Sequence, residues 1–231
     1  MPPVTDLHGN GFALAEIELT HDQCDHLAGS IPAVAPGRGG IRGLISHPSV
    51  LQLLQHQQLG KYLWSIVGRD LVAVKATLFD KTSTSNWRVR WHQDRLIAIR
   101  ERMDVAGYGP WSVKGGDLYV EPPTTVLDQM LAIRVYLDDC GSENGPLRVM
   151  PGSHESGKLS EEALQRRAAE SLSVELLAPK GALLLMRPLL IHASSPSRVP
   201  AHRRVLHIEL APLEAISPLH WHTTIPLRRT A

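Results

Sequence analysis

The sequence has little cysteine and no excess of charge of either sign. Its two cysteines, Cys24 and Cys140, stand far apart and lack a pairing pattern, which favours a reduced cytoplasmic chain over a disulfide framework. The formal net charge of +1 gives no support for a nucleic-acid or anionic-membrane partner. No apolar run is long enough to span a membrane, and residues 1–10 lack the basic-then-apolar pattern of a signal peptide. The composition therefore favours a cytoplasmic protein whose partner is a small molecule.

The remaining composition is that of an ordinary globular protein. The chain has 231 residues, of which 43% are hydrophobic and 20% charged, and it contains no repeats and no low-complexity linker. We therefore expect one domain spanning residues 1–231. Seventeen prolines and eighteen glycines indicate many turns, which suits short strands better than a helical bundle.

Apolar and alternating stretches predict a β-rich chain with helices before and between the strands. Thr20 and Ser160 are typical N-caps, and they predict helices that end near Leu27 and Ser171. A third helix is expected over 49–67, a turn or short helix over 122–130, and a loop over 31–43. The expected strands cover residues 12–19, 71–79, 87–94, 111–114, 131–137, 147–150, 181–186 and 203–210.

Trp91-His92-Gln93-Asp94 is the strongest candidate for chemistry. His92 and Asp94 are two residues apart, so in an extended segment both side chains point to one face. A third ligand must come from elsewhere, and His192 is the candidate because it follows a buried strand. Two histidines and one carboxylate form the facial triad of non-haem Fe(II) oxygenases, which leaves coordination positions open. The alternative is that a short His-x-Asp pattern arose by chance.

With these segments in place, the sequence resembles the phytanoyl-CoA dioxygenase family of Fe(II)- and 2-oxoglutarate-dependent oxygenases. The resemblance runs from about residue 71 to about residue 210. It is carried, in order, by His92-Gln93-Asp94, Asn144-Gly145-Pro146-Leu147, Met150-Pro151-Gly152-Ser153-His154, Ile191-His192-Ala193-Ser194-Ser195 and Arg203. It implies a mainly β (α+β) fold, a double-stranded β-helix or jelly-roll core with N-terminal and inserted helices packed outside. It also implies Fe(II) as cofactor, 2-oxoglutarate as co-substrate, and O2.

The resemblance also indicates which residues bind 2-oxoglutarate. Arg203, eleven residues after His192, stands where the family keeps an arginine for the co-substrate carboxylate. A guanidinium can hold a carboxylate through two parallel hydrogen bonds, and Ser194 can add a neutral one. Arg204 has the opposite strand parity, so we expect it on a solvated face.

Arg134 and Gln93 are further candidates for the same role. Arg134 matches a position that faces the active site in the resembled family, where it could bind 2-oxoglutarate or a substrate carboxylate. The alternative for Arg134 is an ion pair with Asp138 or Asp139. Gln93 has the opposite parity to the two ligands and reaches the site only if the strand turns there.

For the other polar residues, the sequence allows more than one position or role. Lys75 is expected at a solvated edge, with a polar cavity as the alternative. Arg88 and Arg90 share the parity of His92, so they border the cavity or project at its rim. The remaining histidines are expected to be structural: His154, His202 and His207. The cationic set Arg88, Arg90, Lys114 and Arg134 suggests a carboxylate-bearing substrate.

The leading functional hypothesis is therefore an oxygenase that hydroxylates an unactivated C–H bond of a small metabolite and releases succinate and CO2. Desaturation, epimerisation and ring closure use the same machinery and stay open. The competing hypotheses are a metal-free jelly-roll binding module and a jelly-roll metal enzyme that does not use 2-oxoglutarate. The sequence does not indicate an oligomeric state.

Overall fold

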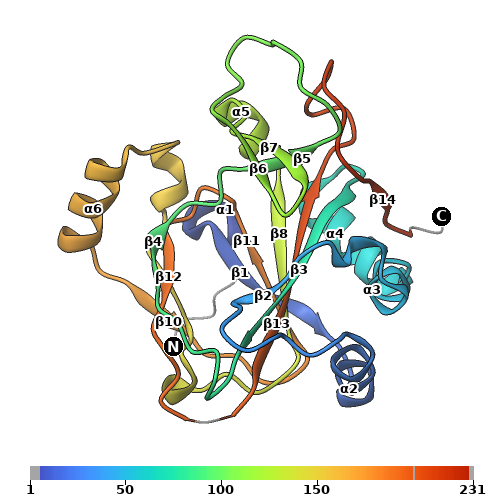
Figure 1. Ribbon diagram of the computed structural model, residues 1–231, viewed down its shortest axis with the longest axis vertical. Helices are drawn as coiled ribbons and strands as arrows, with labels where there is room; N and C mark the ends of the chain where they lie inside the picture. Colours follow the sequence, from blue (N-terminus) through green and yellow to red (C-terminus); the bar gives the residue numbers. More distant parts are fainter. Residues whose placement is uncertain (1–5, 200, 229–231) are drawn as a thin grey trace.

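Two antiparallel sheets form a sandwich, which is the predicted jelly-roll core. The computed structural model describes residues 6–199 and 201–228. The large sheet has seven strands in the order β1-β11-β8-β13-β3-β14, with β2 added to β3, and the small sheet is β10-β9-β12-β4 (Figure 1). Their bounds are β1 Phe12–Glu18, β2 Gly40–Ile41, β3 Val72–Lys81, β4 Val89–His92, β8 Leu131–Tyr136, β9 Leu147–Val149, β10 Val174–Leu176, β11 Ala182–Met186, β12 His192–Ser194, β13 Arg203–Ala211 and β14 Ile225–Pro226.

Alternation along the central strands divides the large sheet into two faces. On β8, Ile133 and Val135 point outward into a core shared with the helices, whereas Ala132 and Tyr136 point inward. The inward residues pack against Leu147 and others of the small sheet. Successive side chains in a strand point to opposite faces, and β8 carries apolar residues on both. Both faces of the sheet must therefore be packed against other elements.

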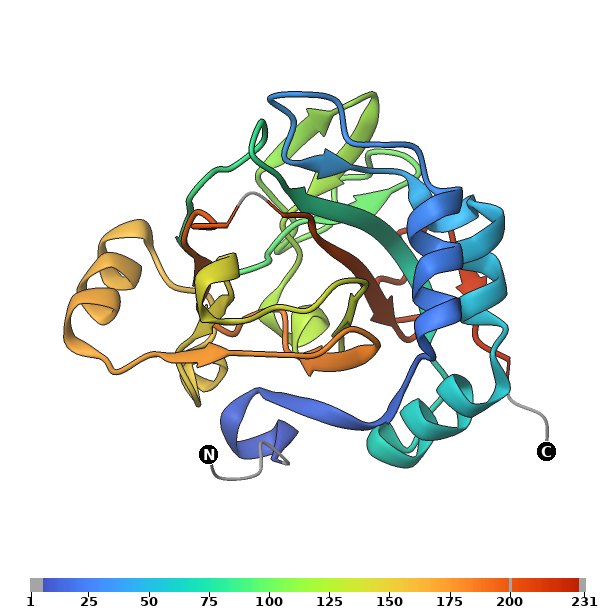
Figure 2. The same ribbon diagram turned by 90° about the horizontal axis from the view of Figure 1, so that it is seen from below.

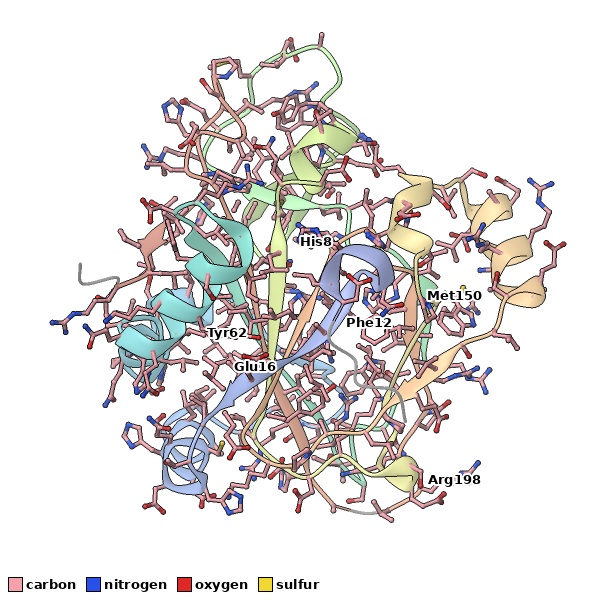
Figure 3. The ribbon with its side chains drawn as sticks, turned by 180° about the vertical axis from the view of Figure 1, so that it is seen from behind. His8, Phe12, Glu16, Tyr62, Met150 and Arg198 are labelled. Atoms are coloured by element: carbon pink, nitrogen blue, oxygen red, sulfur yellow. The ribbon has the colours of Figure 1, made fainter. Side chains whose placement is uncertain are left out.

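Helices cover the outer face of the large sheet (Figures 1 and 2). They are α2 (His21–Ser30), α3 (Pro48–Leu54) and α4 (Gln57–Val67). Thr20 caps α2 as predicted, in a reciprocal capping box with Gln23. On the far side of the molecule, the backbone N–H of Glu16 donates to the Tyr62 hydroxyl at 3.2 Å, which ties α4 to β1 (Figure 3).

The prediction of one helix over 49–67 is wrong, because the chain breaks into α3 and α4 at Gln55 and His56. Both segments bury leucines, so helical spacing continues across the break and hides it.

The predicted loop over 31–43 also contains β2, which pairs with β3. The predicted helix after Ser160 is α6 (Glu161–Glu170), which lies outside the small sheet (Figure 1). The short helices are α1 (Leu7–Asn10) and α5 (Thr124–Leu127).

A third sheet, here called the end sheet, closes one end of the sandwich (Figure 1, top). It consists of β5 (Ile97–Ile99), β7 (Asp117–Val120) and β6 (Trp111–Lys114). Its apolar residues pack against Val74 and Ala211, near the end of the β3–β13 pair. The end sheet therefore covers the space between the two main sheets at this end.

Within the described ranges, no helix combines the length and apolar character needed to cross a bilayer.

Candidate metal centre

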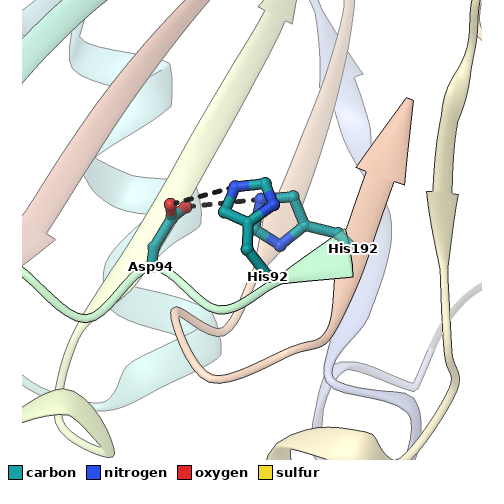
Figure 4. Close-up of side chains that lie close together, drawn as sticks. All are labelled: His92, Asp94 and His192. Atoms are coloured by element: carbon teal, nitrogen blue, oxygen red, sulfur yellow. Dashed lines mark ion pairs between the residues drawn. The ribbon is translucent and has the colours of Figure 1, made fainter. Parts of the chain in front are cut away.

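Pairing of β4 with β12 brings two histidines together from distant parts of the chain. His192 lies directly opposite His92 in the ladder, and their ring centroids are 4.1 Å apart. Asp94 follows β4, where its backbone N–H donates to the Pro188 carbonyl at 2.8 Å. One carboxylate oxygen of Asp94 lies 3.7 Å from Nε2 of His92, and the other lies 3.7 Å from Nε2 of His192 (Figure 4). One ligand atom from each residue lies within 4.8 Å of the others, which is close enough to hold a metal ion.

Backbone carbonyls orient both rings toward this centre. Nδ1 of His92 lies 2.8 Å from the Arg90 carbonyl, and Nδ1 of His192 lies 2.9 Å from the Leu190 carbonyl. A carbonyl only accepts, so each Nδ1 carries the proton and each Nε2 presents its lone pair to the centre. Desolvation, followed by the neighbouring His92, lowers the pKa of His192 to about 3. Burial opposes ionisation of Asp94, but the nearby His192, His207 and His92 lower its pKa below the ordinary range. Neutral imidazoles and an ionised carboxylate are the donor set expected for a divalent first-row metal.

A bulge in β4 explains why two arginines lie outside the cavity. His192 pairs with His92, but Ser194 pairs with Val89, so β4 contains one extra residue over this interval. The bulge reverses the parity of the preceding residues, and Arg88 and Arg90 are exposed in a groove on the outer surface. The prediction that they share the face of His92 is therefore wrong.

The centre opens into a cavity of about 700 Å³, and Arg203 lies in its wall. Arg203 is 3% exposed, and its Nε has no hydrogen-bond partner. A buried guanidinium with an unsatisfied donor is costly unless an anion binds it. Ser194 lines the same cavity. The donors of these two residues fit the chemistry of a carboxylate such as the distal one of 2-oxoglutarate.

Arg204 points the other way, as its parity predicts, but it is not simply solvated. Its Nε and NH2 donate to the two carboxylate oxygens of Asp138 at 2.9 and 2.6 Å. Asp138 is therefore occupied, while Asp139 accepts from the backbone N–H of Lys180. Arg134 forms neither of the ion pairs considered from the sequence and lines the cavity instead.

Lys81 is a site residue that the sequence did not indicate. It is fully buried, lies opposite Arg203 in the ladder, and donates through Nζ to the Ser194 hydroxyl at 3.0 Å and to the Ser195 carbonyl. Burial, followed by the charge of Arg203, lowers the pKa of Lys81 to about 7. Because Ser194 accepts from Lys81, its own proton is free to donate into the cavity. Lys81 was missed because residues 80–86 have the composition of a turn, whereas β3 continues to Lys81.

His207 is also part of the site, so the expectation that it is only structural is wrong. NH1 of Arg134 lies 3.4 Å from Nδ1 of His207, and an arginine can only donate. The proton of His207 is therefore on Nε2, which lies 3.8 Å from Asp94 and 3.9 Å from Glu209. Burial lowers the pKa of His207 to about 3. Strand parity could have indicated this from the sequence, because His207 is four residues after Arg203 and so lies on the same face of β13.

Lys75 occupies the polar cavity rather than a solvated edge. Its Nζ lies 2.6 Å from Glu209 and 5.7 Å from the centroid of the Tyr119 ring. The preferred prediction failed because a lysine in an apolar run is usually solvated, and its partner stands on a strand remote in sequence.

Gln93 holds the loop that carries the ligands. Its Nε2 donates to the carbonyls of Gly157 and Leu189, both at 2.8 Å, and its Oε1 accepts from the backbone N–H of Leu159 at 3.0 Å. These contacts occupy the amide group, so the geometry gives Gln93 a positioning role and not the expected co-substrate contact.

Gln93→Ala should lower the free energy of unfolding by about 2–4 kcal/mol, because it leaves buried backbone groups unsatisfied. Urea unfolding of the metal-free protein measures this change. Gln165→Ala is the control, since Gln165 is exposed and bonds only within α6 to Glu161. Equal stability of the two variants would contradict the role given to Gln93.

The other candidate histidines lie away from the centre. Nε2 of His154 contacts the His8 carbonyl at 3.0 Å, and His202 contacts Asp80 at 2.8 Å. Neither belongs to the group of ligand atoms found among the described residues.

Comparison with known proteins identifies the same fold. The chain matches the non-haem monooxygenase ThoJ, in its nickel complex, with a TM-score of 0.66 and 18% identity over 98% of this chain and 84% of that one. EctD from S. alaskensis in its apo form gives a TM-score of 0.69 and 18% identity, over 97% and 84% of the two chains. The epimerase SnoN in complex with Fe3+, α-ketoglutarate (2-oxoglutarate) and nogalamycin RO gives 0.67 and 12%, over 91% and 82%.

The sequence comparisons place the chain in a family. The search of curated proteins gave no match. The model of the phytanoyl-CoA dioxygenase family matches residues 40–205, an interval that includes His92, Asp94, His192 and Arg203. The chain therefore belongs to the phytanoyl-CoA dioxygenase family, whose members are 2-oxoglutarate-dependent non-haem iron oxygenases.

Proposed function

We propose that this protein hydroxylates an unactivated C–H bond of a small metabolite and releases succinate and CO2. In this proposal His92, Asp94 and His192 hold Fe(II), and Arg203 and Ser194 bind 2-oxoglutarate. The observation that carries it is the cluster of two Nε2 lone pairs and a carboxylate in the same cavity as a buried arginine whose Nε lacks a partner. Together with 2-oxoglutarate and O2, bound Fe(II) supplies the oxidising power that such a C–H bond requires.

The protein residues act by orientation and by charge. The Arg90 and Leu190 carbonyls keep the Nε2 lone pairs of the two histidines directed at the metal position. Arg134 fixes the proton of His207 on Nε2, where it faces a carboxylate oxygen of Asp94. Nε2 of His207 would therefore help to restrain the orientation of the Asp94 carboxylate when Fe(II) is bound. Three residues of the end sheet, Ser112, Lys114 and Tyr119, form part of the cavity wall.

We further propose that residues 1–231 act as one domain in the cytoplasm, on a small molecule and without nucleic acid. The continuity of the strand order supports a single unit, because β1 near the N-terminus and β14 near the C-terminus belong to the same sheet.

Anaerobic titration separates this proposal from a metal-free binding module. Fe(II) and 2-oxoglutarate added to the folded protein should produce a weak visible charge-transfer band, and a binding module would give none. Admission of O2 should then release succinate in an amount that depends on 2-oxoglutarate. Succinate release independent of 2-oxoglutarate would point to another metal chemistry.

The reaction type needs its own measurement, because similar structures include the epimerase SnoN and the carbocyclase SnoK. A hydroxylated product gains the mass of one oxygen atom, and 18O2 labels it. An epimerised product keeps the substrate mass, and ring closure or desaturation loses two hydrogens. Mass spectrometry of the product therefore decides between these outcomes.

His192→Ala should lose iron binding, whereas His154→Ala should retain it. The reason is that Nε2 of His192 faces Asp94, while Nε2 of His154 is engaged with the His8 carbonyl. Anaerobic iron titration of both variants measures the difference. Retention by His192→Ala with loss by His154→Ala would show that His192 is not the third ligand.

A further inference from the structure

The charge of the cavity indicates what kind of substrate it accepts. Six lysine and arginine side chains and three carboxylates line it. Fe(II) is a dication and 2-oxoglutarate is a dianion, so binding both leaves this excess of positive charge unchanged. This inference rests on the proposed function, and it means that the loaded cavity still attracts an anion.

The carboxylates of the cavity already have partners. Glu209 accepts from Lys75, and Glu121 lies 3.5 Å from Arg95 and 3.2 Å from Lys158. Asp94 faces the metal position. The cavity therefore offers few free acceptors to a cationic substrate.

Two cations at the exposed rim are not paired in this way. Arg42, which directly follows β2, and Lys114, at the end of β6, line the cavity. Neither forms an ion pair with any described residue. Exposed charges add little binding energy because water screens them, but they attract and orient an approaching anion.

Deeper in the cavity, two hydroxyls lack partners. Thr77 is 3% exposed, and its Oγ1 makes no hydrogen bond; Oγ of Ser112 is also buried without a partner. Both residues line the cavity. Buried hydroxyls in native proteins are nearly always hydrogen-bonded, so these two need a polar partner, which a bound water or a ligand in the cavity can supply.

The ladder positions place these hydroxyls around Lys75. Thr77 is two residues after Lys75 on the same face of β3. Ser112 lies opposite Tyr119 in the end sheet, and the Tyr119 ring contacts Nζ of Lys75. Nζ has three protons and Glu209 takes one, which leaves donors for a ligand.

We propose that the primary substrate carries a carboxylate, which Thr77, Ser112 and Lys75 bind between β3 and the end sheet. Arg203, which we propose binds 2-oxoglutarate, lies at the opposite end of the β3–β13 ladder from the paired residues Lys75 and Glu209. The reacting carbon then lies on the metal side of the carboxylate. The substrate is a small molecule, because a cavity of this size also has to hold 2-oxoglutarate.

The test uses the full chain loaded anaerobically with Fe(II) and 2-oxoglutarate, with the charge-transfer band recorded first. The probe is an equimolar mixture of small carboxylic acids and the methyl ester of each, and retained compounds are identified by mass spectrometry. We expect acids to be retained at least about 10-fold over their own esters. Thr77→Val should weaken retention about 10- to 100-fold while the band is unchanged.

Thr125→Val is the matched control, because Thr125 is exposed on α5. Lys75 is left intact, since its removal would leave Glu209 buried without its partner. Esters retained as well as acids, no acid retained, or acids retained equally by Thr77→Val would overturn the inference. A normal band with any of these outcomes leaves the proposed function standing, whereas absence of the band removes both.

Discussion

Asp94→Ala should abolish substrate-coupled turnover and weaken Fe(II) binding by about 100-fold or more. Changes to groups that only orient a ligand typically cost 10- to 100-fold in metal affinity, and loss of a ligand should cost at least as much. Asp94 supplies the only carboxylate in the ligand cluster among the described residues. Without it, two neutral imidazoles face the metal position. Anaerobic iron titration and succinate formation measure the two effects.

The fold of this variant should be intact, because the backbone N–H of residue 94 still donates to the Pro188 carbonyl. Asp104→Ala provides the control, since the Asp104 side chain is 93% exposed. The melting temperatures of both metal-free variants should match that of the unmodified protein. Normal activity of folded Asp94→Ala would remove Asp94 from the proposed ligand set.

Arg203→Ala should raise the apparent KM for 2-oxoglutarate about 30- to several-thousand-fold. Loss of one partner from a desolvated charge pair typically costs about 2–5 kcal/mol. Arg203 is 3% exposed and its Nε awaits a partner, so the carboxylate would lose its main neutralising group. Succinate formation measured against 2-oxoglutarate concentration gives the change. Arg203→Lys should recover only part of the affinity, because an ammonium cannot reproduce the paired hydrogen bonds of a guanidinium.

Arg204→Ala is the neighbouring control. Arg204 contacts Asp138 outside the cavity, so its loss should change 2-oxoglutarate binding by less than about 0.5 kcal/mol, although it should lower thermal stability. A larger KM defect in Arg204→Ala would mean that the register of β13 is one residue away from that described. Normal KM values in both variants would make Arg134 the next residue to test.

The parts of the fold that follow from the sequence are those with local signals. Apolar runs identified β3 and β11, alternation identified β8 and β13, and the capping residues Thr20 and Ser160 identified α2 and α6. The break at Gln55 and His56 carries no proline or glycine, so helical spacing concealed it. Arrangement of the strands into two sheets depends on contacts between distant residues, and only the family resemblance predicted it.

The site shows the same division between local and distant information. His92 and Asp94 were predicted as ligands from their spacing, and Arg203 was preferred to Arg204 by its parity and its distance from His192 in the sequence. The roles of His207 and Lys75 were predicted wrongly because their partners, Arg134 and Glu209, stand on other strands. Lys81 was missed because β3 continues into a segment with the composition of a turn. The bulge in β4 had no signal in the sequence, and it reversed the expected direction of Arg88 and Arg90.

The end sheet carries part of the proposed substrate site but none of the residues proposed to bind iron and 2-oxoglutarate, so the two sites can change separately in evolution. The proposed iron and co-substrate residues stand on β4, β12 and β13 or next to them. Ser112, Lys114 and Tyr119 stand on β6 and β7, whose strand pairing, among the residues that the structure describes, lies within the end sheet. Substitutions within β6 and β7 can therefore alter the part of the cavity proposed for the substrate without changing the pairing of β4 with β12. Substrate preference can therefore diverge through changes in the end sheet while the proposed iron site stays intact at every step.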